Sequence, residues 1–228
     1  MLLNIETSTD FCSVALNNND KLLFSTADER GQNHASLLSD FVQKALNFAK
    51  SNGEKIDAIA VSAGPGSYTG LRIGIATAKG LCFGLNVPMI AVDTLQIMNN
   101  ATKGEIDSTD KNILLCPMID ARRMEVYCAL YNFDKTIIGE IKAEIITENS
   151  FAEVLKDHTI YFFGTGIEKC KTVLKHSNCR YIECIFPFAE NMISLSYGKF
   201  QQKIFEDIAY FEPFYLKEFQ ATKAKNFF

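Results

Sequence analysis

The sequence predicts an α/β fold that is built twice from the same succession of elements. Stretches typical of strands alternate with stretches typical of helices along the 228 residues. The order of three strands, helix, strand, helix, strand and helix occurs before the polar loop at residues 103–111 and again after it. A repeated order of this kind favours a gene duplication that produced two α/β layers, each with a mixed sheet. The alternative is a single α/β arrangement in which the order repeats by coincidence.

In the first half, strands are indicated by alternating or compact apolar runs between turn-forming residues. They are expected at residues 2–8, Cys12–Leu16, Lys21–Thr26, Asp57–Ala63 and Pro88–Val92. The run Asn17-Asn18-Asn19-Asp20 has the composition of a hairpin turn. Helices are expected at His34–Lys50, at Leu71–Phe83 and from Asp93-Thr94 onward, and Ser51-Asn52-Gly53 ends the first of them.

The second half shows the same kinds of element in the same order. Strands are expected at Asn112–Ile119, Met124–Tyr131, Thr136–Ile146, Thr159–Phe163 and Tyr181–Cys184, and helices at Asn149–Asp157, from Gly166 to about Lys175, and at Ala189–Phe205. We therefore expect one subdomain at residues 1–105 and another at residues 106–228, each of βββαβαβα type. This scheme resembles that of the actin, hexokinase and Hsp70 superfamily (ASKHA).

Composition and charge narrow the function classes. Apolar residues make up 47% and charged residues 22%, as in ordinary globular proteins with a full core. No stretch approaches the ~18 apolar residues of a membrane span, and Glu6 interrupts the apolar N-terminal run, so no signal peptide is predicted. The net charge is −4, and only Arg122-Arg123 and Lys217–Lys225 concentrate basic residues. Because nucleic-acid binding usually needs a basic face, any RNA contact is expected mainly through a partner.

The seven cysteines indicate a reducing compartment. They are scattered and include no Cys-x-x-Cys pair, so the paired ligands of a structural zinc site are missing. Cys12, Cys82, Cys116 and Cys128 lie inside apolar segments, where cysteine acts as a small core residue. The sequence therefore predicts a cytoplasmic protein without disulfides.

Glycines mark the expected turn between the strand at Asp57–Ala63 and the helix that follows. Gly64, Gly66 and Gly70 allow the backbone to approach another group closely. Ser67 or Thr69 can cap the helix, whose free N–H groups favour an anion. Two interpretations stay open, a phosphate or carboxylate cradle and a capped tight turn that binds nothing. The loop is neither a Walker A loop nor a Gly-x-Gly-x-x-Gly loop.

The same loop resembles the signature of the TsaB family, formerly called YeaZ. The signature loop consists of Gly64, Pro65, Gly66, Ser67, Tyr68, Thr69 and Gly70, and it continues as Leu71-Arg72-Ile73-Gly74. Other stretches that resemble the family are Leu3–Ser8, Gln32-Asn33-His34, Val92–Leu95, Asp120–Tyr127 and Pro213–Lys217. The resemblance is more specific in the N-terminal half. It implies an actin-like/Hsp70-like duplicated fold and a role in forming threonylcarbamoyladenosine (t6A) in tRNA.

The resemblance also implies that this chain is not the catalytic subunit. In the related subunit TsaD, a helix after the third strand carries His-x-x-x-His metal ligands, whereas here Leu38 stands four positions after His34. Replacing one imidazole of an i, i+4 pair leaves a poor metal site. No Gly-x-Ser-x-Gly nucleophile motif occurs. We therefore expect no metal and no catalytic residue, with Mg-ATP or ADP as a cofactor only at the level of the complex.

Two enzymatic alternatives belong to other classes. An ATP-dependent small-molecule kinase of the actin-like superfamily would hold Mg²⁺-ATP between the halves, near Glu6 and Asp120. Neither residue is followed by the glycine-rich phosphate turn of such kinases. The turn Gly164-Thr165-Gly166 is open to two interpretations, a contact with adenine or ribose and a simple strand-to-helix connection. A metalloprotease would need the histidine pattern that Leu38 interrupts.

Two helices of the first half carry more packing surface than one core requires. Apolar residues of the helix from His34 cover an arc of about 180°, whereas a surface helix needs only about 100°. In the next helix, small residues form one ridge of Gly70, Gly74 and Ala78 and another of Ala76, Gly80 and Gly84. Glycine inside a helix costs ~1 kcal/mol relative to alanine, so these repeats indicate close approach of another element. Packing on the chain's own sheet must explain at least one ridge, and two interpretations of the surplus surface stay open, a second helix of the same chain and a partner protein.

The resemblance implies the partner for the surplus surface. In the TsaB family these two helices meet the equivalent helices of TsaD, or pair two TsaB molecules when TsaD is absent. The residues expected at this interface are His34, Leu38, Phe41, Val42, Ala45, Arg72, Gly74, Ile75, Ala76 and Lys79. The implied function is a scaffold or activating subunit. With it and the ATPase TsaE, TsaD transfers the threonylcarbamoyl group to N6 of adenosine 37 in tRNAs that read ANN codons. The tRNA is expected to be a partner only through the complex, and no membrane partner is expected.

Overall fold

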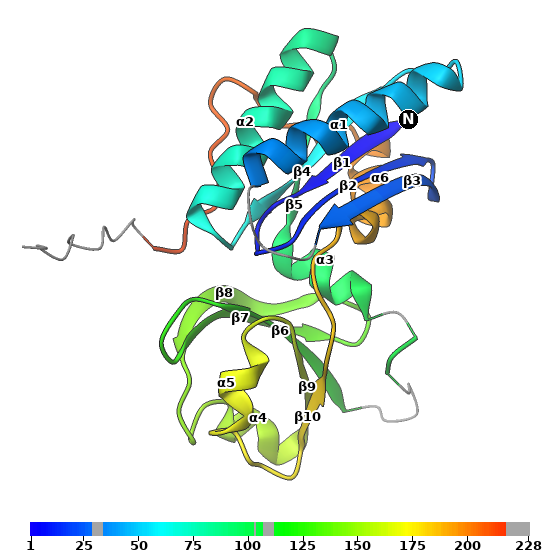
Figure 1. The fold of residues 1–228 in the computed structure, drawn as a ribbon. Coiled ribbons are helices and arrows are strands. Elements are labelled where there is room, and N and C mark those ends of the chain that lie inside the picture. The colour runs from blue at the N-terminus through cyan, green and yellow to red at the C-terminus, as the bar shows by residue number, and fades with distance from the viewer. Residues whose placement is uncertain (29–33, 103, 107–111, 218–228) are drawn as a thin grey trace, which may run out of the picture.

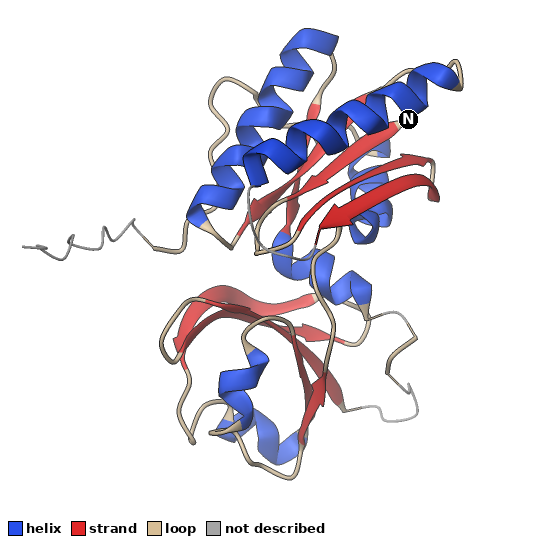
Figure 2. Ribbon diagram, in the orientation of Figure 1, coloured by secondary structure: helices blue, strands red, loops and turns tan. Residues whose placement is uncertain are grey.

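The structure is a computed structural model that describes residues 1–28, 34–102, 104–106 and 112–217, and it forms two α/β subdomains (Figures 1 and 2). Each subdomain has a five-stranded sheet. The strands of the first sheet are β1 (Leu2–Glu6), β2 (Cys12–Asn18), β3 (Lys21–Asp28), β4 (Ala58–Gly64) and β5 (Met89–Asp93). Those of the second are β6 (Ile113–Asp120), β7 (Glu125–Asn132), β8 (Ile137–Ile145), β9 (Thr159–Phe163) and β10 (Cys179–Ile182).

The two sheets have the same topology. The strand order is β3-β2-β1-β4-β5 in the first and β8-β7-β6-β9-β10 in the second. β1 pairs antiparallel with β2 and parallel with β4, and β6 pairs antiparallel with β7 and parallel with β9. This strand-by-strand correspondence confirms the duplicated, actin-like α/β fold that the order of elements predicts.

Helices cover both faces of the first sheet. On one face lie α1 (His34–Ser51) and α2 (Tyr68–Leu85), which share a core with the strands (Figure 1). On the other lie α3 (Thr94–Ala101), the short 3₁₀ turn η1 (Ala189–Met192) and α6 (Ile193–Gln201). Because both faces are covered, β1 and β4 are almost entirely buried and mostly apolar. No helix in the described part of the chain is long and apolar enough to cross a membrane.

The second sheet is covered on one face by α4 (Ala152–Asp157) and α5 (Ile167–Lys171). Its other face packs against α3, whose Leu95 and Met98 share a core with Leu115 and Phe163 of the sheet. Helix α3 therefore contacts both sheets. The four cysteines expected in apolar segments are buried, which confirms their assignment as core residues: Cys12, Cys82, Cys116 and Cys128.

The structure differs from the expected division into residues 1–105 and 106–228. After β10 the chain returns to the first subdomain, where η1 and α6 pack on the sheet. Two buried hydrogen bonds fix the return: the Ala189 N–H donates to Ser13 Oγ (2.8 Å), and Ser196 Oγ donates to Asn4 Oδ1 (2.6 Å). The apolar second face of the first sheet requires such a cover. The first subdomain therefore includes η1 and α6 in addition to the N-terminal half.

Most element boundaries lie close to their expected positions. The helix expected at Ala189–Phe205 divides into η1 and α6 and ends at Gln201, and α2 begins at Tyr68 rather than at Leu71. Some expectations fall outside the described residues. These concern Gln32-Asn33, the loop at 103–111 apart from 104–106, and the basic residues beyond Lys217.

Candidate functional site

The signature loop joins β4 to α2 and is fixed against the end of β1. Ser67 caps α2, since its Oγ accepts the Gly70 N–H at 3.3 Å, and its own N–H donates to the Ser8 carbonyl at 2.6 Å. A capping hydroxyl satisfies one of the free N–H groups at a helix start. Of the two capping residues that the sequence offers, Ser67 and Thr69, the structure uses Ser67.

Three glycines let α2 lie against the residues that follow β1. A Cβ atom at Gly66 or Gly70 would lie within 3 Å of the backbone oxygen of Ser8 or Thr7, respectively. A Cβ at Gly74 would come equally close to Thr7 Oγ1. Thr7 Oγ1 in turn donates to the Gly70 carbonyl at 2.8 Å. The loop and the first turns of α2 are thus built for close packing, which favours the tight-turn interpretation over an anion cradle.

The two small-residue ridges of α2 face in opposite directions. The inner ridge, Gly70, Gly74 and Ala78, is buried against the sheet. The outer ridge, Ala76, Gly80 and Gly84, is exposed, and a Cβ at either of its glycines would meet nothing within 4 Å. Phe83 lies beside it on the next turn with 83% of its surface exposed. The chain's own core therefore explains the inner ridge, whereas the outer ridge is exposed in the part of the chain that the structure describes.

Burial corrects the expected interface set. Six of its members lie in the core between the helices and the first sheet: Leu38, Phe41, Val42, Ala45, Gly74 and Ile75. Leu38 and Ala45 are completely buried, so neither has a side-chain surface to offer a partner. The broad apolar arc of α1 is used by the chain's own core. Arg72 and Ala76 are exposed, and His34 and Lys79 are partly exposed.

His34 has a local structural contact. Its Nε2 lies 3.0 Å from the Thr9 carbonyl oxygen and 3.3 Å from that of Phe11, so the protonated nitrogen donates to the turn between β1 and β2. This contact ties the start of α1 to the first sheet. Among the described residues, no group of three or more His, Cys, Asp and Glu side chains gathers as metal ligands would.

Arg72 of α2 is held by a C-terminal segment, Glu206–Lys217, which we call the strap. Arg72 Nε donates to Tyr215 Oη at 3.1 Å, and its guanidinium carbon lies 4.0 Å from the centre of the Tyr68 ring. The Tyr68 and Tyr215 rings are themselves 4.9 Å apart. The sequence offers no signal for this contact between residues 143 positions apart, although the strap's Pro213–Lys217 is one of the stretches that resemble the TsaB family.

A cleft of about 900 Å³ lies between the two subdomains. Its walls come from the signature loop, the turn after β1, the turn between β6 and β7, and the strap. The residues that line it are Ser8–Asp10, Pro65–Thr69, Ile119–Arg123, Glu125, Tyr127, Thr165 and Phe214–Lys217. The structure thus brings three stretches of the resemblance together around one cleft: the signature loop, Asp120–Tyr127 and the strap's Pro213–Lys217.

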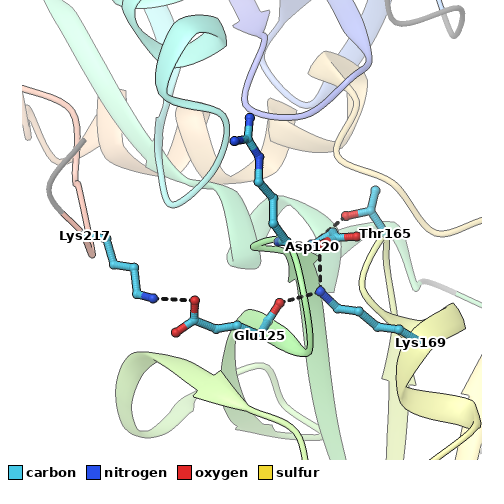
Figure 3. Close-up of polar contacts among 6 residues, drawn as sticks. Asp120, Glu125, Thr165, Lys169 and Lys217 are labelled. Atoms are coloured by element: carbon cyan, nitrogen blue, oxygen red, sulfur yellow. Dashed lines mark hydrogen bonds and ion pairs between the residues drawn. The ribbon is translucent and has the colours of Figure 1, made fainter. Parts of the chain in front are cut away.

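On the side of the cleft that the second subdomain forms, lysines pair with the acidic side chains of Asp120 and Glu125 (Figure 3). Lys169 Nζ donates to Asp120 Oδ1 at 2.7 Å and to the Glu125 carbonyl at 2.5 Å. Thr165 Oγ1 accepts the Asp120 N–H at 3.0 Å. The carboxylate of Glu125 forms an ion pair with Lys217 of the strap. Asp120, one of the two residues considered for the kinase alternative, is therefore paired with Lys169, and Thr165 holds the turn at the end of the strand.

Glu6, the other acidic residue considered for a kinase site, is completely buried and does not line the cleft. Burial raises its pKa to about 7, against the opposing effect of hydrogen bonds from Ser8. One carboxylate oxygen accepts the Ser8 N–H at 2.5 Å, and the other has no hydrogen-bond partner among the described residues. Glu6 thus belongs to the packed base of the signature loop.

Comparisons with known proteins all lead to the proteins of tRNA threonylcarbamoyladenosine formation. Residues 28–226 match the family model described as "TsaD: tRNA N6-adenosine threonylcarbamoyltransferase". The chain is 33% identical to the tRNA threonylcarbamoyladenosine biosynthesis protein TsaB of Escherichia coli, over 97% of this chain and 96% of that protein. It is 30% identical to the Bacillus subtilis protein of the same name, over 72% of this chain and 70% of that one.

A solved structure is similar along almost the whole chain. It is described as an uncharacterized protein with similarity to peptidase YEAZ from Pseudomonas aeruginosa, and it matches with a TM-score of 0.79 and 26% identity. The match covers 95% of this chain and 99% of that one. These similarities do not favour the kinase alternative. The chain belongs to the TsaB family of tRNA threonylcarbamoyladenosine biosynthesis proteins.

Proposed function

We propose that this chain is a non-catalytic scaffold subunit that docks on a TsaD-type threonylcarbamoyltransferase through the outer ridge of α2. The observation that carries the proposal is the exposed ridge of Ala76, Gly80 and Gly84, at whose two glycines a Cβ would meet no atom of the described residues within 4 Å. The partner transfers the threonylcarbamoyl group to N6 of adenosine 37 in tRNAs that read ANN codons. Docking of this chain holds the TsaD-type partner in a competent state.

The glycines of the outer ridge need a compensating contact outside the chain. Gly80 lies in the interior of an 18-residue helix, where glycine costs ~1 kcal/mol relative to alanine. Packing within the chain does not require it, because a Cβ there would meet nothing within 4 Å. A second helix that approaches the α2 backbone closely is the contact that a small residue permits. The ridge is therefore suited to a helical partner surface.

Phe83 supplies apolar area beside the ridge. It follows Gly80 by one helical turn, so the two positions are neighbours on the helix surface. Its side chain is 83% exposed, and burying a phenylalanine contributes about 1.5–3 kcal/mol. Leu85, 44% exposed, extends this apolar end of α2. Exposed large apolar side chains beside a small-residue ridge are typical of a protein–protein interface.

Several further features belong to the same proposal. The net charge of −4 supports a role in which the tRNA is bound mainly by the rest of the complex. TsaE joins as a third component, and two copies of this chain pair through the α2 face when the TsaD-type subunit is absent. The chain holds no cofactor by itself, and Mg-ATP or ADP acts at the level of the complex. Its compartment is the cytoplasm.

A leucine at Gly80 tests the docking face. Gly198 in α6 is the matched control, since it too is a helical glycine at which a Cβ would meet nothing within 4 Å. The assay measures affinity for the TsaD-type subunit of the same organism, and t6A formation at limiting concentrations of this chain. Gly80→Leu should weaken binding about 5-fold or more, since overpacking costs about 1–3 kcal/mol. Gly198→Leu should leave both quantities unchanged.

Equal affinity and equal activity for wild type and Gly80→Leu would sink the proposed docking face. A complex that forms but transfers no faster than the TsaD-type subunit alone would contradict the activating role. Transfer by this chain without its partner would contradict the non-catalytic assignment.

A further inference from the structure

The strap is fixed to the first subdomain along its length. The Glu206 N–H donates to the carbonyl of Met89, the first residue of β5, at 2.9 Å. Phe211 packs against the core beneath α1 and α2. The Phe214 N–H donates to the Ala63 carbonyl at 2.8 Å, at the end of β4. The strap therefore runs from the start of β5 to the signature loop, held by its own backbone.

Lys217, the last described residue of the strap, contacts the second subdomain. Lys217 forms an ion pair with Glu125 at the start of β7, in the second subdomain (Figure 3). The side chain of Glu125 is only 15% exposed, so this pair is partly shielded from solvent. Phe214–Lys217 also line the cleft. The strap thus links the two subdomains along one side of the cleft.

The same segment fixes a residue of the docking helix. Two residues before Lys217, Tyr215 accepts the Arg72 Nε–H at 3.1 Å, and Arg72 also lies over the Tyr68 ring. Arg72 precedes Ala76, the first residue of the outer ridge, by four positions, so the two share one exposed face of α2. A four-residue stretch of the strap therefore touches both the second subdomain and the edge of the docking face.

We propose that the strap is a latch that couples closure of the cleft to docking at α2. With Lys217 paired to Glu125, the subdomains are held closed, and Tyr215 keeps Arg72 in place beside the outer ridge. Releasing the pair lets the cleft open and frees Arg72, so a partner that binds the outer ridge must then immobilise the Arg72 side chain. Because the strap contacts both the cleft and the docking face of α2, a change at either one affects the other. The coupling to docking rests on the proposed function, whereas closure of the cleft is a property of the chain alone.

Charge reversal tests the latch in the isolated chain. Lys217→Glu places two carboxylates together, and the exchange Lys217→Glu with Glu125→Lys restores the pair in reverse. Lys175→Glu is the matched control, because Lys175 is an exposed lysine of the second subdomain with the same change in charge. Because Lys217 is still 44% exposed, the pair is only partly shielded, and we expect modest effects, about threefold to fivefold in the equilibrium between closed and open forms.

Two spin labels report the opening. They are attached to cysteines placed at the exposed positions Lys50 on α1 and Glu148 before α4, after Cys179 and Cys184 are changed to serine. The other five cysteines are buried. In Lys217→Glu, we expect a broader distance distribution with a longer mean. The charge exchange should recover the wild-type distribution, and the control variant should match it.

The second readout is affinity for the TsaD-type subunit, which should fall about threefold to fivefold in Lys217→Glu and recover in the charge exchange. Unchanged label distances in Lys217→Glu would overturn the latch. Altered distances with unchanged affinity would overturn the coupling, and so would an equal effect of the control variant. If wild type does not bind the partner at all, the proposed function fails, and with it the coupling; the label distances still decide whether the latch exists.

Discussion

Adding one methyl group to each ridge of α2 should change stability in opposite directions. In Gly70→Ala the new Cβ lies within 3 Å of the Thr7 backbone oxygen, which belongs to the turn after β1 and has little room to move. Overpacking of this kind costs about 1–3 kcal/mol. In Gly80→Ala the new Cβ meets nothing within 4 Å, and the helix gains up to ~1 kcal/mol in propensity.

For a chain of this size, 1 kcal/mol shifts the unfolding midpoint by about 2–4 °C. We therefore expect Gly70→Ala to lower the Tm by roughly 2–12 °C and Gly80→Ala to raise it by up to about 4 °C. Thermal unfolding followed by circular dichroism measures both, with Gly198→Ala as a second open-space control. If Gly70→Ala were as stable as Gly80→Ala, the division into an inner and an outer ridge would be refuted.

Three further expectations test the fold around the site. Burial raises the pKa of Glu6 to about 7, so the folded state holds this proton more tightly than the unfolded state, and the free energy of unfolding should fall by on the order of 3 kcal/mol as the pH rises from 4.5 to 7. In urea unfolding, Glu6→Gln should flatten this pH dependence and leave the smaller effect of Asp93, whose pKa burial raises to about 6. Ser67→Ala removes the cap of α2 and should cost about 1 kcal/mol in the same assay, and a loss below the error would contradict the capping role. Ser196→Ala leaves Asn4 Oδ1 without its donor and should cost about 1–3 kcal/mol while speeding hydrogen exchange in α6; unchanged exchange there would contradict the tie between α6 and the first sheet.

The sequence was sufficient for the fold because both sheets depend on local patterns. Apolar runs bounded by turn residues placed all ten strands near their observed positions, and their order predicted the duplication. The return of the chain was not predictable in this way. Whether η1 and α6 cover the second sheet or the first depends on which face lacks a cover, and tertiary contacts such as Ser196 to Asn4 decide it.

The candidate site was predictable in its elements and not in its surfaces. Spacing identified two ridges on α2, but only the position of the sheet shows that Gly74 faces inward and Gly80 outward. The apolar arc of α1 suggested a partner surface, yet Leu38 is fully buried in the chain's own core. Arg72 was expected to face a partner, and it is held by Tyr215, a contact that helical spacing does not encode.

The most direct test of the account is a hydrogen-exchange footprint of this chain with and without the TsaD-type subunit of its organism. The outer ridge and Phe83 lie within Ala76–Leu85 of α2, so binding should slow exchange across these residues and leave α6 unchanged. Protection confined to the second subdomain, with unchanged exchange in α2, would contradict docking through the outer ridge.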